Sequence, residues 1–153
     1  MSQLNVFGKE LELCCSSPIT GAYRDGYCNT GINDVGTHTV CAMVTDKFLE
    51  FSKSKGNDLT TANSYYKFEG LKEGDKWCLC VSRWIEAYEA GCAPNLILEA
   101  TNIKTLDYVS FENLSEYKAW IKRRRYAYGL INKMLFRSIS PTCSRFIFNK
   151  KHL

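Results

Sequence analysis

The sequence predicts a single compact α+β domain of two layers, with a small sheet, about three helices and long ordered loops. Short runs rich in β-branched residues are interspersed with segments that carry helix-capping residues and helical apolar spacing. The 153 residues suffice for one hydrophobic core but are few for two. We therefore expect one domain over residues 1–121 and a basic C-terminal extension over 122–153.

The expected elements follow from local patterns. Residues 5–36 are rich in Gly, Asn, Asp and Pro, which favours ordered loops and short strands. Strands are expected over 37–44, 76–81 and 95–101. Helices are expected over 46–55, 82–91 and 111–121, with Thr45, Ser82 and Ser110 as their N-caps. Residues 57–76 return to loop.

Composition is that of a soluble globular protein, with 45% hydrophobic and 24% charged residues. No apolar run approaches the roughly 18 residues that span a bilayer, and the first residues lack the pattern of a secretory signal. We therefore expect a cytoplasmic protein without membrane contact.

The net charge of +4 is uneven along the chain. All 16 acidic residues precede residue 122, whereas nine of the 20 Lys and Arg residues lie in 122–153. Nucleic acid is therefore disfavoured as a partner, except weakly through 122–153. That extension fits a basic arm, a continuation of the preceding helix or a loosely structured end, and its weak periodicity favours the last.

Eight cysteines are many for a chain of this length, and seven of them precede residue 93. Because no secretory signal is present and seven is an odd number, free buried thiols, a metal site or a reactive thiol are favoured over structural disulfides. Phosphate-binding, zincin, serine-hydrolase and EF-hand motifs are all missing from the sequence, and no cofactor is indicated.

The stretch GTHTVCA at residues 36–42 contains the only histidine that precedes the basic extension, so a Cys/His mechanism in the body of the protein must use His38. On a regular strand His38 and Cys41 point to opposite faces. A histidine near a strand end and a core thiol are then the simplest interpretation.

Two further cysteine motifs could carry chemistry. Cys78 and Cys80 would share one face of a strand, which suits two metal ligands or two core thiols. Cys28 follows Arg24 and Asp25, which could orient a ligand. A CxC motif alone is weak support for a metal site, because no second CxxC pair accompanies it.

The blocks NVFGKELELCC, YRDGYCNTG, DVGTHTVCAMV and DKWCLCVSRW closely resemble the uncharacterised domain-of-unknown-function family 2237, over about residues 4–118. The resemblance implies a compact α+β domain and no established activity. It points to the CC, RDGYC, GTHTVCA and WCLC motifs as the candidate cluster, whereas Cys92 departs from the aliphatic residue expected there.

Three hypotheses follow. The first is a pocket lined by thiols and His38, with thiol-dependent enzyme or redox activity. The second is a non-catalytic domain that binds a small molecule or a protein and has structural cysteines, and the third, less favoured, is a metal-binding module. The candidate catalytic residues are Cys14, Cys15, Asp25, Cys28 and His38, the candidate ligand-binding residues are Arg24 and Cys41, and the candidate metal ligands are Cys78 and Cys80. Whether the protein is an enzyme, and on which substrate, is left open.

Overall fold

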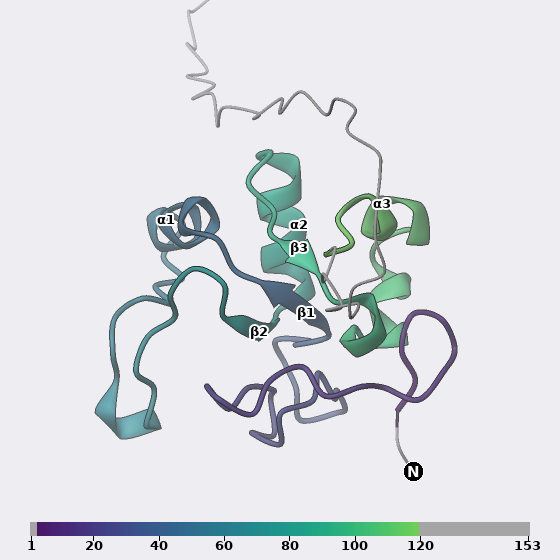
Figure 1. Ribbon diagram of the computed structural model, residues 1–153, viewed down its shortest axis with the longest axis horizontal. Helices are drawn as coiled ribbons and strands as arrows, with labels where there is room; N and C mark the ends of the chain where they lie inside the picture. Colours follow the sequence, from purple (N-terminus) through teal and green to yellow (C-terminus); the bar gives the residue numbers. More distant parts are fainter. Residues whose placement is uncertain (1–2, 120–153) are drawn as a thin grey trace, which may run out of the picture. The chain divides into compact units, whose positions relative to one another are not determined.

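The computed structural model describes residues 3–119 (Figure 1). The strands are β1 (Val40–Met43), β2 (Lys76–Leu79) and β3 (Asn95–Leu96), and the α-helices are α1 (Asp46–Ser54), α2 (Val81–Glu89) and α3 (Phe111–Glu116). Short 3₁₀ helices are η1 (Ser64–Tyr66), η2 (Leu98–Ala100) and η3 (Ile103–Asp107). The expected α+β class is confirmed. The expectations for 122–153 lie outside the described residues.

The three strands form one antiparallel sheet in the order β2-β1-β3, so β1 is central. The β1–β2 register places Val40 opposite Leu79 and Cys41 opposite Cys78. Helix α1 follows β1 and α2 follows β2, as the colours of Figure 1 trace. The two strands that carry the cysteine motifs are therefore direct neighbours, although their paired residues are far apart in sequence, as Cys41 and Cys78 are.

Helix α1 begins where the sequence predicts. The Thr45 side chain accepts a hydrogen bond from the backbone N–H of Phe48, as an N-cap does. The C-cap is Lys55, and Gly56 follows with a φ of 79°, a left-handed conformation that suits glycine.

The other two helices differ from the prediction at one end. Helix α2 begins at Val81 with Cys80 as its N-cap residue, so the expectation that Ser82 caps it was wrong. The cause is tertiary: the Val81 N–H donates to the carbonyl of Thr37 at 3.0 Å. Helix α3 has the predicted cap at Ser110 but ends at Glu116, before the expected 121.

The strands are shorter than expected. Thr37 has a φ of 51°, and the N–H of Thr39 donates to the carbonyl of Thr37 at 2.9 Å. This tight turn excludes residues 37–39 from the strand, so His38 lies outside β1 and strand alternation does not govern its direction. The third expected strand is also cut short, because η2 begins at Leu98.

The two faces of β1 and β2 differ in what covers them. Val40, Ala42 and Leu79 belong to the main apolar core, which also holds fully buried Trp84 from α2 and Phe48 from α1. Alternate residues on the same strands, Cys41 and Cys78, belong to a smaller cluster of cysteines on the other side. Period-two alternation thus places helices over one face and sulfur on the other. Within residues 3–119, no helix is long and apolar enough to cross a membrane.

Candidate functional site

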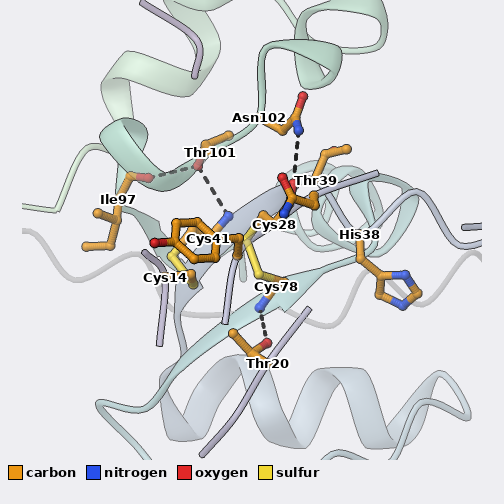
Figure 2. Close-up of a disulfide and its surroundings, with 12 residues drawn as sticks. Cys14, Thr20, Cys28, His38, Thr39, Cys41, Cys78, Ile97, Thr101 and Asn102 are labelled. Carbon is orange, nitrogen blue, oxygen red and sulfur yellow. Dashed lines mark hydrogen bonds between the residues drawn. A yellow bond between two sulfur atoms is a disulfide. The ribbon is translucent and has the colours of Figure 1, made fainter. Parts of the chain in front are cut away.

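Four cysteines form two disulfides next to the central strand pair. Cys14 bonds to Cys41 and Cys28 bonds to Cys78, with Cα–Cα distances of 5.8 and 5.2 Å (Figure 2). All four side chains are buried. The expectation that free thiols are favoured over disulfides was therefore wrong for these residues. An odd number of cysteines does not exclude disulfides, because the fold pairs some cysteines and leaves others as free thiols.

Buried polar side chains hold the loops against this cluster. The N–H of Cys78 donates to Thr20 Oγ1 at 2.7 Å, and that of Cys41 donates to Thr101 Oγ1 at 3.2 Å. Asn102 Nδ2 donates to the carbonyl of Cys28 at 3.0 Å. Figure 2 shows these contacts around the disulfides. They satisfy backbone groups that would otherwise be buried without partners, and so fix where the loops lie.

A second group lies at the ends of the same two strands. His38 precedes β1, and Cys80 follows β2 as the N-cap residue of α2. The hydrogen bond from Val81 to Thr37 joins these two chain segments directly. Cys80 is half-buried and carries a free thiol, and this thiol is the largest cause that raises the pKa of His38. In Figure 2 the His38 ring points away from the disulfides.

Asp34 supports the other side of the His38 ring. Its Oδ1 lies 2.6 Å from His38 Nδ1, and its Oδ2 accepts from the His38 N–H at 2.7 Å and from Thr30 Oγ1 at 2.9 Å. The carboxylate is almost fully buried, with 1% of its side chain exposed. A carboxylate on Nδ1 places a proton there. The three residues thus form a cysteine–histidine–aspartate chain.

The contacts among Cys80, His38 and Asp34 favour the charged forms of His38 and Asp34. The hydrogen bond to Cys80 is the largest cause that raises the pKa of His38, burial opposes it, and Asp34 adds to it, so that the pKa rises to about 9. Burial opposes ionisation of Asp34, but its hydrogen bonds from His38 and Thr30 outweigh burial and lower its pKa. At neutral pH, His38 is therefore an imidazolium between two acidic groups.

The GTH turn sets the position of the ring. A Cβ added at Gly36 would collide with the His38 ring, so only glycine leaves room for it. Thr37 is a β-branched residue in the left-handed region, which costs roughly 1–2 kcal/mol relative to an ordinary conformation. The turn is held by the Thr37 N–H donating to the Asp34 carbonyl at 3.1 Å. The left-handed conformation of Thr37 and the lack of a side chain at Gly36 together direct the His38 ring toward Cys80.

Other predicted site residues lie apart from this chain. Arg24 donates to the Ile19 carbonyl, and its guanidinium lies 5.4 Å from the centre of the Trp77 ring. Asp25 accepts from the Tyr27 N–H and from Asn29 Nδ2. Asp25 therefore has its partners within its own loop, and Arg24 contacts its own loop and Trp77.

The predicted cysteines divide into three kinds. Cys14, Cys28 and Cys41 are in disulfides and carry no thiol while those bridges are closed. Cys15 is a free thiol that donates to the Ser17 carbonyl. Cys78 and Cys80 have different partners, because Cys78 is bridged to Cys28 whereas Cys80 contacts His38. A shared metal on that pair has no support in this arrangement.

Sequence reasoning missed Asp34 and the pairing of His38 with Cys80. Asp34 lies four residues before His38 in DVGTH, and a glycine between them is a signal for a turn that could bring the two together. Nothing in the local sequence connects residue 38 with residue 80, because strand pairing creates that contact.

A cavity of about 510 Å³ lies on the Asp34 side of the site. Asp34 and Thr37 contribute to its wall. The remaining lining residues are Gln3, Leu4, Thr30, Gly31, Asn102, Ile103, Lys104, Asp107 and Tyr108. Its size is in the range of small-molecule sites.

The fold and these side chains define a small disulfide-bonded α+β domain with a cysteine–histidine–aspartate chain at the rim of its sheet. The protein belongs to the family described as "Uncharacterized protein conserved in bacteria (DUF2237)", whose model matches residues 4–118. This match confirms the resemblance and covers both the disulfides and the Cys80 site. A comparison with curated proteins found no match.

Proposed function

We propose that this protein is a thiol-dependent enzyme in which Cys80 is the nucleophile, His38 its proton partner and Asp34 the residue that orients His38. The observation that carries the proposal is the free Cys80 thiol on one side of the His38 ring and the buried Asp34 carboxylate on the other. A nucleophile, a base and a group that orients the base are the parts that covalent catalysis by cysteine requires.

Two features beside Cys80 suit a nucleophilic sulfur. An imidazolium beside the sulfur stabilises negative charge on it. Cys80 also stands at the N-terminal end of the nine-residue helix α2, where the helix dipole favours an anion. Cys15, the other free thiol of the described residues, has a backbone carbonyl as its partner instead. The two free thiols should therefore differ strongly in reactivity.

Acyl transfer is the reaction class that the arrangement of Cys80, His38 and Asp34 suits. The Cys80 sulfur would add to the carbonyl carbon of an ester, thioester or amide, and the imidazolium would give its Nε2 proton to the leaving group. Water would then attack the thioester, with His38 taking its proton, and the Cys80 thiolate would leave with the carboxylic acid as product.

The first test compares the two free thiols within one molecule. The intact protein is alkylated with iodoacetamide at pH 7, and peptide mass mapping gives the rate at each cysteine. We expect Cys80 to react at least about 10-fold faster than Cys15, because only Cys80 has a cationic neighbour. His38→Gln should remove this advantage, and Cys15→Ser should leave the Cys80 rate unchanged. Equal rates at the two cysteines, or an unchanged rate in His38→Gln, would overturn the proposal.

A second test examines the chemistry itself. An activated acyl ester should transfer its acyl group to Cys80, which mass mapping detects as an adduct on the peptide that contains Cys80. Cys80→Ser should abolish the adduct, and Cys15→Ser should retain it. Rapid alkylation without any acyl adduct would keep the activated thiol and reject acyl transfer.

A further inference from the structure

Besides the Cys80 site, the described residues contain a buried group of four cysteines that two disulfides join. The Sγ atoms of Cys14, Cys28 and Cys78 all lie within 4.8 Å of one another, and Cys41 is bonded to Cys14. In a tetrahedral zinc–thiolate site with Zn–S bonds of about 2.3 Å, the sulfurs are about 3.8 Å apart. Opening both disulfides would free the four sulfurs to move toward that spacing.

We infer that, once its two disulfides are reduced, this cluster is a zinc site with Cys14, Cys28, Cys41 and Cys78 as its four ligands. The inference is independent of the proposed function, because neither Cys80 nor His38 takes part. It also replaces the predicted metal pair of Cys78 and Cys80 with a set that the sheet and its covering loops bring together.

The ligands are positioned by contacts that do not depend on the disulfides. Cys41 and Cys78 face each other across the β1–β2 ladder. The N–H of Cys14 donates to the Gly26 carbonyl at 2.9 Å, and Asn102 holds the carbonyl of Cys28. Reduction would therefore leave each thiol close to its present place, which reduces the cost of assembling a metal site.

The chemical surroundings favour a structural zinc site over other ions. All four cysteines have 3% exposure or less, and the cluster also contains the apolar side chains of Ile97, Ala100 and Ala119. Four buried thiolates without an open position form the closed site typical of structural zinc. Soft sulfur ligands also select zinc over magnesium or calcium, which prefer oxygen.

Reduction of the two bridges and binding of zinc are separate steps. Two molecules of a dithiol reductant each give two electrons and two protons to one bridge and become disulfides, which produces four cysteine thiols. One Zn²⁺ then forms four Zn–S bonds and displaces four protons. Oxidation by a disulfide of suitable potential would reverse both steps and release the ion. The same four side chains would thus hold either two bridges or one metal.

The experiment uses the full chain and zinc or cobalt ions alone as the probe. Protein reduced under argon with a phosphine reductant is mixed with one equivalent of metal, freed of excess ion and examined by native mass spectrometry. We expect one metal per chain after reduction and none in the oxidised protein. Cobalt should give the intense visible and near-ultraviolet absorption of tetrahedral thiolate ligation.

Two variants identify the ligands. A variant with Ser at the other four cysteines, Cys15, Cys80, Cys92 and Cys143, should still bind one equivalent. In that background, Cys28→Ser should weaken zinc binding at least about 10-fold, because one of four ligands is lost. Circular dichroism follows folding, and zinc should raise the melting temperature of the reduced protein.

Two results would overturn the inference. One is that the reduced, folded wild-type chain takes up no zinc, or that reduction unfolds the chain and zinc does not restore the fold. The other is that zinc uptake needs Cys80 or is unchanged by Cys28→Ser, because the ion would then lie elsewhere.

Discussion

The two groups of cysteines on strands β1 and β2 have opposite environments. Cys41 and Cys78 lie inside the paired part of the ladder, where they are buried and bonded to Cys14 and Cys28. Cys80 lies one residue past the end of β2, where it is half-buried and has a free thiol beside an imidazolium. Cys78 and Cys80 are only two residues apart. Burial and partners, rather than residue type, decide which cysteine is structural and which can react.

The largest expected effect concerns the bridge from Cys28 to Cys78, which closes a sequence separation of 50 residues. Replacing both cysteines with alanine should lower the free energy of unfolding by about 4 kcal/mol, because the unfolded chain gains the freedom that this long loop denies it. Urea unfolding without reductant measures the change. Cys15→Ser is the control and should change stability little. A loss below about 1 kcal/mol would show that the loops are held mainly by their hydrogen bonds.

The buried carboxylate of Asp34 should have the next largest effect. Asp34→Asn places an amide against donors from His38 and Thr30, so at least one charge-assisted hydrogen bond is lost. We expect about 2 kcal/mol of destabilisation and slower alkylation of Cys80. Asp25→Asn is a matched control, since Asp25 is exposed and accepts hydrogen bonds only from its own loop. If both variants behave alike, Asp34 has no special role at His38.

Gly36→Ala tests whether the turn positions the histidine. The added methyl group would collide with the His38 ring, and overpacking of this kind costs about 1–3 kcal/mol. Because the ring would move away from Cys80, we also expect a several-fold slower alkylation of Cys80. Val35→Ala is the control, because the neighbouring Val35 side chain is exposed. An unchanged alkylation rate in Gly36→Ala would show that the ring does not need its present position.

The last prediction is a pH dependence of stability, which solvent weakens because 34% of the His38 side chain is exposed. Folding raises the pKa of His38 from 6.5 to about 9, so the native state binds this proton more tightly than the unfolded state. The resulting stabilisation is fully present below about pH 6.5 and is lost as the pH rises through about 9. His38→Gln should lack this dependence. Unfolding curves of both proteins at pH 6, 8 and 10 measure it, and a difference that grows with pH would contradict it.

Local signals predicted some elements well. Thr45 and Ser110 cap α1 and α3 as expected, since a capping side chain bonds to N–H groups only a few residues away. The starts of α2 and β1 were predicted wrongly, because α2 starts where Val81 donates to the distant Thr37 carbonyl and β1 starts only after the left-handed turn at Thr37. A pattern within a short window does not contain such a contact.

The candidate site was likewise predicted only in part. The motifs that contain His38 and Cys80 were both chosen from the sequence, and the alternation rule separated His38 from Cys41. That rule does not apply to His38, because the left-handed Thr37 ends the extended conformation before the strand begins. The contact of His38 with Cys80 came from pairing between β1 and β2, and the disulfide partners of Cys41 and Cys78 came from loops packed against these strands.

The sequence by itself determined the α+β class, the family and the motifs in which chemistry is to be sought. These properties depend on local periodicity, on capping and turn residues, and on blocks of residues in a recognisable order. Only the tertiary structure decided that Cys14 meets Cys41, that Cys28 meets Cys78 and that Cys80 meets His38. The reason is physical: long-range contacts are set by strand register and loop packing, which many distant residues fix together.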